Sequence, residues 1–323
     1  MAGVDGARRA AAWKMQRPPT GELVIDHLGH FVPDANAGAV ALEQLGFVVP
    51  PFSIHLHRND ETSPLVAAGT GNRCVMLERG YLEFLSPISD APNAREVLDA
   101  TARYVGVHLI AFGTNDPRAD YARLAAQGFR PTPVVDLQRQ VETAEGEATV
   151  KFRVVRALHG AMEEGRIQFC EQRAPEVIWQ PRWMDHPNRA RTLEWIVICV
   201  ADPFAVAQRF SRFTGLQSSQ VGETASFRLD TLRGAIGFLH KADTETLFHA
   251  RAPAVPWIAG YVLGVDDIEE SRRYFRASGL ATRELGADRF AVAAPQAVGG
   301  FVMFQPLTES VLGYPPGVAT PQV

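Results

Sequence analysis

The stretch "FVPDANAGAVALEQLGF", Phe31 to Phe47, contains the pattern that decides the fold. An apolar segment leads to an aspartate, a helix of about three turns follows, and a glycine precedes a large apolar residue. Aspartate accepts hydrogen bonds from the free N–H groups at a helix start, and glycine adopts the left-handed conformation that ends a helix. The pattern predicts a strand, a helix between Asp34 and Gly46, and a returning chain anchored by Phe47.

The same pattern occurs three more times along the chain. The spacing from aspartate to glycine is nearly constant, at Asp34–Gly46, Asp116–Gly128, Asp202–Gly215 and Asp267–Gly279. Each helix is followed by alternating or apolar segments that turn residues separate, which is the pattern of β-strands. Each unit therefore reads strand–helix–strand–strand–strand, and four such units indicate an α+β protein built by internal repetition.

Composition sets limits on the class of protein. The chain has 323 residues, of which 46% are hydrophobic and 21% charged, and its net charge is −4, so no basic stripe favours nucleic acid. No apolar run is long enough to span a bilayer. Cys74, Cys170 and Cys199 lie far apart, which excludes a cysteine-rich zinc site and fits a reducing cytoplasm. We expect residues 1–20, rich in Ala and Arg, to be a disordered leader.

Four short motifs accompany the repeat, and with it they resemble the vicinal oxygen chelate superfamily of glyoxalase-like and bleomycin-resistance-like proteins. They are "HLGHFVPD" (His27–Asp34), "GTGN" (Gly69–Asn72), "YLEFLSP" (Tyr81–Pro87) and "HPNRA" (His186–Ala190). The resemblance extends from about Leu23 to about Leu307 and implies four βαβββ modules in two paired halves. We expect a first half over 21–185 that carries the site, a degenerate second half over 186–315, and a tail over 316–323.

The resemblance also implies a metal site, because ligands in metal-binding members come from the first and last strands of each module. The matching positions are His27, Glu83, His108 and Gln168. Strand alternation places His30 on the face opposite His27, which excludes His30. Two imidazoles, one carboxylate and one amide oxygen suit a divalent Zn, Ni, Co, Mn or Fe ion. A single buried histidine is more often structural, so the hypothesis depends on the set of four.

The second half should lack such a site. The equivalent positions there are assigned to Trp195, Gly237, Ala259 and Val302, none of which offers a side-chain donor atom to a cation. We therefore expect the second cavity to be apolar, filled or collapsed, with Trp195 and Phe238 as candidates to fill it.

The resemblance favours a metal-dependent enzyme of the lyase or isomerase type, in which the cation offsets charge on the adjacent oxygens of an enediolate. An amide cannot accept the proton, so Gln168 leaves Glu83, or a metal-bound hydroxide, as the candidate catalytic base. Two alternatives stay open. His27, His108 and Glu83 would also satisfy the two-histidine, one-carboxylate set of an Fe(II) ring-cleaving dioxygenase. A metal-free binding or resistance protein would hold a ligand without turning it over.

Three further polar residues are candidates for substrate binding. His55 and His57 share one face of their strand and would line the cavity mouth, although a solvated edge strand explains them equally well. Asn72 ends a turn that would meet the substrate or simply connect a hairpin. We expect a small-molecule substrate, no nucleic acid, no membrane partner and a cytoplasmic protein, and we leave a homodimer open.

Overall fold

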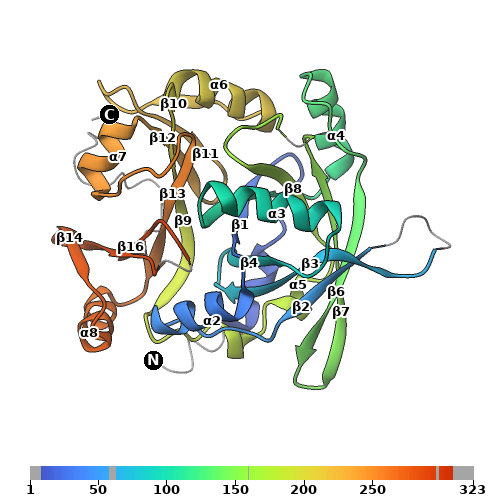
Figure 1. The fold of residues 1–323 in the computed structure, drawn as a ribbon, viewed down its shortest axis with the longest axis horizontal. Coiled ribbons are helices and arrows are strands. Elements are labelled where there is room, and N and C mark those ends of the chain that lie inside the picture. Colours follow the sequence, from blue (N-terminus) through green and yellow to red (C-terminus); the bar gives the residue numbers. More distant parts are fainter. Residues whose placement is uncertain (1–8, 58–62, 159, 296–297, 308–323) are drawn as a thin grey trace.

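The computed structural model describes residues 9–57, 63–158, 160–295 and 298–307 (Figure 1). It is an α+β protein in which the strands form one continuous sheet. In Figure 1 the first half of the chain, from blue to green, lies mostly on the right, and the orange and red elements lie on the left. No helix of the described residues is long and apolar enough to cross a membrane.

The first half contains two βαβββ runs joined by α3 (Pro92–Arg103). The first run is β1 (Val24–Phe31), α2 (Ala35–Gln44), β2 (Ser53–His57), β3 (Val66–Met76) and β4 (Tyr81–Pro87). The second run is β5 (Gly106–Gly113), α4 (Pro117–Ala126), β6 (Val135–Thr143), β7 (Gly146–Arg156) and β8 (Arg166–Gln172). Two short helices, α5 (Pro175–Ile178) and η2 (Pro181–Trp183), lead to the second half.

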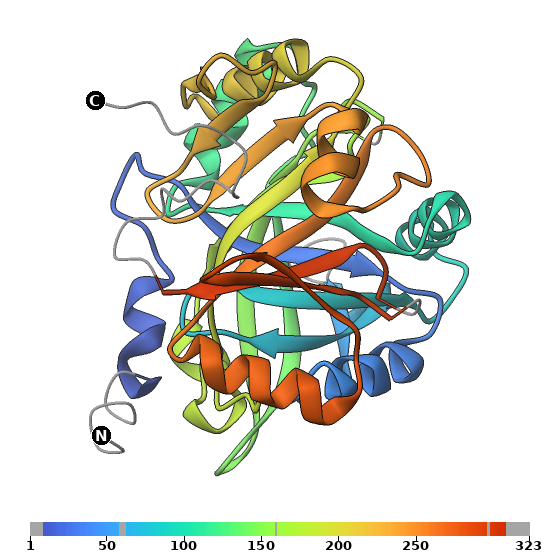
Figure 2. The same ribbon diagram turned by 90° about the vertical axis from the view of Figure 1, so that its left-hand side faces the viewer.

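The second half repeats the same order, with α7 (Lys241–Phe248) between its two runs. The third run is β9 (Ala190–Cys199), α6 (Pro203–Thr214), β10 (Ser218–Gln220), β11 (Phe227–Asp230) and β12 (Ala235–Leu239). The fourth run is β13 (Trp257–Val265), α8 (Ile268–Ser278), β14 (Thr282–Gly286), β15 (Arg289–Ala293) and β16 (Phe301–Pro306). Figure 2 shows α8 close to α2, where the Tyr274 hydroxyl donates to the Gln44 carbonyl at 3.3 Å.

The predicted helix boundaries are confirmed at both ends of the four repeat helices. Each capping aspartate accepts a backbone N–H at 2.8 to 3.0 Å, at Asp34, Asp116, Asp202 and Asp267. Each following glycine has a positive φ of 72 to 82°, at Gly46, Gly128, Gly215 and Gly279. The repeat therefore marks the same helix ends in all four modules.

The two halves differ in how their strands close. In the first half the order β1-β4-β3-β2-β6-β7-β8-β5 returns to β1, because β1 also pairs with β5, so these strands form a closed barrel. In the second half the order β10-β11-β12-β9-β13-β16-β15-β14 leaves β10 and β14 unpaired to each other within the described residues. The halves join where Ile258 of β13 pairs with Val107 of β5. Among the described strands, those of the first half alone therefore enclose an interior on all sides.

A pair of β-bulges shifts the register where β1 meets β5. Ile25 pairs with Phe112 but His27 pairs with Ala111, so Asp26 is an extra residue in β1. Gly29 pairs with Leu109 but His30 pairs with Val107, so His108 is an extra residue in β5. A bulge interrupts the alternation of side chains along a strand, which changes the residues that face the barrel interior.

The concave face of the second-half sheet is filled by apolar side chains. Trp195, Ala259 and Met303 belong to one buried cluster, and α7 adds Phe248, which stacks on Phe301 at 4.5 Å. Phe238 contacts Phe210 of α6 at 5.0 Å and belongs to a different cluster. Trp195 therefore fills this space as expected, whereas Phe238 does not.

The segment before the first strand corrects one expectation. Residues 9–20 pack on the barrel instead of forming a disordered leader, because η1 (Ala12–Met15) buries Ala12 beside Trp179 and Met184. Arg9 adds an ion pair to Asp185 at 2.9 Å. Residues 1–8 and the predicted tail over 316–323 lie outside the described residues.

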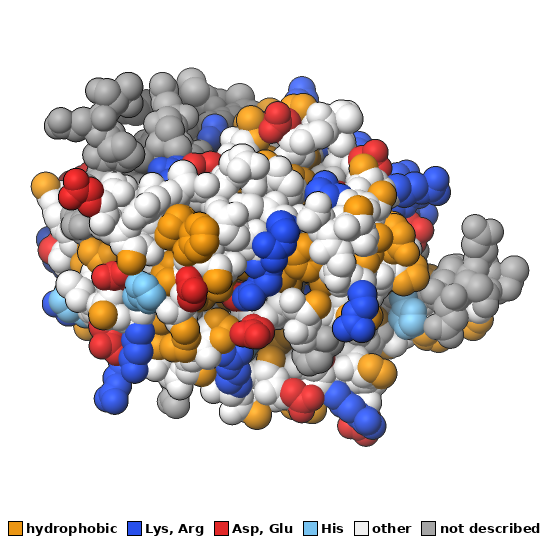
Figure 3. All heavy atoms as spheres, turned by 90° about the horizontal axis from the view of Figure 1, so that it is seen from above, with side chains coloured by type: hydrophobic (Ala, Val, Ile, Leu, Met, Phe, Trp, Pro, Cys, Tyr) orange, Lys and Arg blue, Asp and Glu red, His pale blue; other side chains and the backbone are white. Residues whose placement is uncertain are grey.

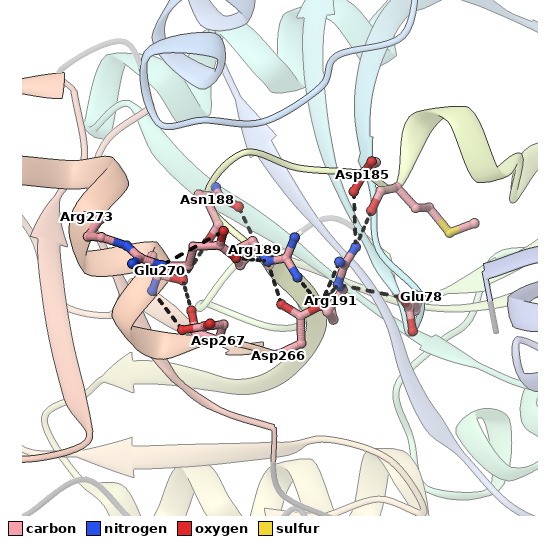
Figure 4. A network of polar contacts seen from close by, with 12 residues as sticks. Glu78, Asp185, Asn188, Arg189, Arg191, Asp266, Asp267, Glu270 and Arg273 are labelled. Carbon is pink, nitrogen blue, oxygen red and sulfur yellow. Dashed lines mark hydrogen bonds and ion pairs between the residues drawn. The ribbon is translucent and has the colours of Figure 1, made fainter. Parts of the chain in front are cut away.

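A polar network holds the connection between the halves (Figure 4). His186 is buried, donates to the Met76 carbonyl at 2.8 Å and accepts the Val48 N–H at 3.0 Å. Arg191, which is fully buried, lies 2.7 Å from Asp266 of the second half and 3.8 Å from Glu78 of the first. Motif "HPNRA" is therefore a structural joint.

The face of the molecule that lies at the top in Figure 1 carries charges of both signs. Figure 3 shows lysine, arginine, aspartate and glutamate side chains interspersed with apolar ones over the described residues of this face.

Candidate functional site

The barrel of the first half encloses a cavity of about 270 Å³. Its walls are the inward-facing, alternate residues of the barrel strands, such as Tyr81, Glu83 and Leu85 on β4 and Ala68, Thr70 and Asn72 on β3. This volume lies just below the usual range for ligand pockets, about 300–1,000 Å³. The polar residues on the wall are His27, His55, His57, Thr70, Asn72, Glu83, Asn93, Thr132, Arg139, Arg156, Arg166, Gln168 and Gln172.

The carboxylate of Glu83 is the centre of the polar cluster. One oxygen, Oε2, lies 3.8 Å from Nε2 of His27, and the other, Oε1, lies 3.5 Å from Nε2 of His55. Asn72 donates from Nδ2 to Oε1 at 2.7 Å and also contacts Nε2 of His55 at 3.0 Å. Glu83 is 6% exposed, so these contacts are made largely away from water. The sequence-predicted residues His27, His55, Asn72 and Glu83 thus meet at one point.

The rings of His27 and His55 are each held by a hydrogen bond at Nδ1, the nitrogen that lies away from Glu83. Nδ1 of His27 donates to Oδ2 of Asp26 at 2.6 Å, and Nδ1 of His55 donates to the Thr70 hydroxyl at 3.2 Å. Asp26 assigns the ring proton of His27 to Nδ1, and the Asn72 amide donor at Nε2 assigns the ring proton of His55 to Nδ1, so each Nε2 is an acceptor on the side of the Glu83 carboxylate. Two acceptors facing a carboxylate form an arrangement that a cation between them would stabilise.

Electrostatics favour an ionised Glu83 beside a neutral His55. Burial opposes ionisation of Glu83, but His55, His27 and the Asn72 hydrogen bond outweigh it and lower the pKa of its carboxyl. Burial lowers the pKa of His55 to about 4, although Glu83 acts in the opposite direction. At neutral pH the cavity therefore contains a carboxylate and an uncharged imidazole.

Asp26 is a site residue that alternation along β1 did not predict. It is fully buried, holds His27, and accepts a second hydrogen bond from Gln172 at 3.0 Å. The bulge in β1 brings neighbouring side chains to the same region, so Asp26 and His27 can contact each other. Donor atoms of Asp26, His27 and Cys170 lie within 4.8 Å of one another, but burial raises the pKa of the Cys170 thiol well above its usual value. In the absence of a cation, Cys170 is therefore protonated at neutral pH.

The prediction that His108 belongs to the metal set is corrected. Its Nε2 donates to the Tyr104 carbonyl at 2.8 Å, its ring stacks on Tyr104 at 3.9 Å, and it lines a different cavity of about 840 Å³. The physical reason is the bulge in β5, because the extra residue points away from the barrel interior. Leu109 lines the site cavity instead. His27 on β1 pairs with Ala111, which lies two residues after Leu109. Leu109 on β5 pairs with Gly29, which lies two residues after His27. Leu109 is therefore the counterpart of His27 in the second run.

Gln168 occupies the position on β8 that Glu83 occupies on β4. Glu83 pairs with Gly29 on β1, and Gln168 pairs with Ala111, the counterpart of Gly29, on β5. Gln168 lines the cavity and is 7% exposed. His57 also lines the cavity. His30 is fully buried outside it and stacks on Phe84 at 4.2 Å, which confirms that His30 faces away from His27.

The second half places apolar residues at all four counterpart positions, two of which differ from the expectation. Trp195 and Gly237 correspond to His27 and Glu83, as expected. A bulge makes Ala259 an extra residue in β13, so Gly260 is the counterpart of Leu109. Val262 of β13 pairs with Met303 of β16, so Met303 is the counterpart of Gln168. Ala259 and Val302 are therefore each displaced by one residue. Trp195, Gly237 and Gly260 offer no cation-binding side chain, and Met303 offers only a thioether.

The barrel, its paired βαβββ runs and the inward-facing cluster define a vicinal oxygen chelate protein. A family profile described as a glyoxalase-like domain matches residues 25–214, more than half of the 323-residue chain. The chain belongs to this glyoxalase-like domain family, and the resemblance seen in the sequence is confirmed. No curated protein matches it.

Solved structures show the same fold. A hypothetical protein from Staphylococcus aureus matches with a TM-score of 0.57 and 11% identity, over 88% of this chain and 100% of the other. A variant of 4-hydroxymandelate synthase from Streptomyces coelicolor matches with a TM-score of 0.53 and 17% identity, over 91% and 95%. A fusion of a xylose isomerase-like TIM barrel with a 4-hydroxyphenylpyruvate dioxygenase matches with a TM-score of 0.55 and 14% identity, over 92% and 51%.

Proposed function

We propose that the protein is a metal-dependent enzyme of the glyoxalase-like class that acts on a small oxygenated molecule inside the first-half barrel. The observation that carries the proposal is the position of the Glu83 carboxylate, one oxygen of which faces Nε2 of His27 and the other Nε2 of His55. His55 takes the role for which His108 was expected, because it supplies the second imidazole of the cavity.

Two of the donor pairs have separations compatible with a shared divalent cation, although the three side chains are not grouped as tightly as Asp26, His27 and Cys170, whose donor atoms lie within 4.8 Å of one another. Atoms that share an ion at bond lengths of about 2.1 Å are about 3.0 Å apart when adjacent and about 4.2 Å apart when opposite. The separations of 3.8 Å and 3.5 Å at Glu83 lie between these values. Two imidazoles and one carboxylate suit Zn, Ni, Co, Mn and Fe. His27, His55 and Glu83 would hold the ion, and the ion would supply Lewis-acid stabilisation of charge on substrate oxygens.

The surrounding residues have distinct roles in this proposal. Asp26 positions His27 and Thr70 positions His55, so that both Nε2 atoms keep their direction. Asn72 holds the Glu83 side chain, and a carboxylate oxygen of Glu83 is the group that can accept a proton from a substrate. Gln168, an amide, can orient a substrate oxygen by hydrogen bonding but cannot act as a base. His57 lines the cavity and would contact the substrate.

A ring-cleaving dioxygenase is a second candidate, and the donor set itself favours it. Two histidines and one carboxylate form the ligand set of non-haem Fe(II) oxygenases. Two of the structural relatives are named as 4-hydroxymandelate synthase and a 4-hydroxyphenylpyruvate dioxygenase fusion, and they share the fold of this chain. A lyase or isomerase reaction and a dioxygenase reaction would therefore use the same three side chains, those of His27, His55 and Glu83.

Metal content and two probe reactions test the proposal. Purified protein, prepared without chelator, should contain about one divalent ion per chain. Loaded with Ni²⁺ or Zn²⁺, it should consume a thiol–2-oxoaldehyde adduct if it is of the lyase or isomerase type. Loaded with Fe²⁺ under air, it should consume oxygen with catechol if it is a dioxygenase. Protein that binds none of these ions, yet binds ligand, would contradict the proposal and favour a metal-free binding protein.

A further inference from the structure

A buried arginine faces the site cavity without a carboxylate partner. Arg139 lies on β6, lines the cavity and is 7% exposed. Its guanidinium has one hydrogen bond to another described residue, a contact of 3.8 Å to Sγ of Cys74, and no ion pair within 4.0 Å among the described residues. A guanidinium has five N–H donors, so a single contact to sulfur leaves most of its hydrogen-bonding capacity unused.

The other arginines on the cavity wall already have partners. Arg166 donates to both carboxylate oxygens of Glu96, one at 3.0 Å. Arg156 donates to the side-chain oxygen of Asn93 at 3.3 Å. These two side chains also line the neighbouring cavity of about 840 Å³, so they stand where the two cavities meet. Arg166 has a carboxylate counterion and Arg156 is only half-buried, so Arg139 is the buried guanidinium of the three whose counterion must come from elsewhere.

Burying an unpaired cation is strongly unfavourable unless an anion compensates it. Arg139 lines the same cavity as His55 and Glu83. It also lines a second neighbouring cavity, of about 640 Å³, so it stands in the wall between the two spaces. The site cavity is the one in which an anion bound to Arg139 would also reach His55 and Glu83.

We propose that Arg139 binds a carboxylate of the substrate inside the barrel cavity, and this proposal rests on the proposed function. A carboxylate matches the planar fork of a guanidinium through two parallel hydrogen bonds. A phosphate dianion would need a second cation without hydrogen-bond partners, whereas Arg166 is paired with Glu96 and Arg156 donates to Asn93. Leu109, Leu137 and Phe152 form an apolar part of the same wall. The substrate class is therefore a small carboxylic acid with an apolar body and oxygens that reach Glu83.

The test compares 4-fluorobenzoate with 4-fluorobenzamide, which have nearly the same shape but differ in charge. Calorimetry should give at least tenfold tighter binding of the benzoate to wild-type protein, both after chelator treatment and after Co²⁺ loading. Arg139→Met should abolish this preference, and Arg139→Lys should keep part of it. Arg153→Met, at an outward-facing residue paired with Asp136, is the matched control and should keep all of it.

The outcomes separate this proposal from the proposed function. In Co²⁺-loaded protein the ¹⁹F signal of bound benzoate should broaden, because the cavity contains the ion. Equal affinity for benzoate and benzamide in the wild type would overturn the proposal without any variant. A preference that survives Arg139→Met would place the carboxylate on another group, and binding without broadening in protein that contains Co²⁺ would place it in the neighbouring cavity. Chelator-treated protein tests Arg139 even if no metal binds.

Discussion

Leu109 occupies on β5 the position that His27 occupies on β1. His27 pairs with Ala111, two residues after Leu109, and Leu109 pairs with Gly29, two residues after His27. The first-half barrel is therefore symmetric in its backbone but not in its chemistry. The polar cluster lies on the β1–β4–β3–β2 side, with His27, Glu83, Asn72 and His55.

A histidine at position 109 should restore the missing donor. Leu109→His introduces an imidazole of similar volume on the cavity wall, so we expect Co²⁺ to bind about tenfold more tightly than to the wild type, because a fourth side-chain donor replaces water. Calorimetric titration measures the change. His108→Leu, one residue away on the bulge, is the matched control and should bind as the wild type does. Unchanged affinity in Leu109→His would show that position 109 does not face the ion.

Removing the carboxylate behind His27 should weaken the site without removing a ligand. Asp26→Asn keeps the shape of the side chain but loses the negative charge that accepts the hydrogen bond from His27. In that hydrogen bond, Nδ1 of His27 lies 2.6 Å from Oδ2 of Asp26. Loss of such a partner typically weakens metal binding by about 10- to 100-fold. The dissociation constant for Co²⁺ and the pH dependence of binding are the measurements. Affinity equal to the wild type would show that Asp26 is only a core residue.

The helix boundaries, the repeat and the residues around Glu83 could be predicted from the sequence, because caps and alternation are local properties. The bulges could not be predicted from alternation, since an extra residue in a strand has no distinct side-chain signature. His108 was misassigned for this reason, and Ala259 with it. One sequence signal would have corrected both: His27, Leu109, Trp195 and Gly260 each lie seven residues before a capping aspartate.

Long-range contacts account for the other differences. Arg139 and His55 reach the site because the β2–β6 pairing closes the barrel, as in the pair His57–Leu137, and local patterns do not reveal such a closure. Residues 9–20 looked like a leader because their composition is simple, yet Ala12 packs beside Trp179, more than 160 residues away in sequence.

The joint between the halves should make the fold sensitive to acid. Burial lowers the pKa of His186 from 6.5 to about 4, so neutral His186 stabilises the folded state above pH 6.5, and this stability is lost as the pH falls toward 4. Between pH 7 and pH 5 the loss should be about 2 kcal/mol. His186→Gln can keep both backbone contacts without titrating. Its free energy of unfolding in urea should fall by about 2 kcal/mol less over this range. Parallel pH profiles would contradict the assignment.

We propose that one metal site lies in the first half, at Glu83 and His27, and that His108 is not part of it. Calorimetric titration of chelator-treated protein with Co²⁺ tests it most directly. The wild type and His108→Ala should each saturate at one ion per chain with similar affinity, since His108 lines another cavity. His27→Ala and Glu83→Gln should bind at least 100-fold more weakly. No binding to the wild type, two ions per chain, or equal losses in His108→Ala and His27→Ala would contradict the account.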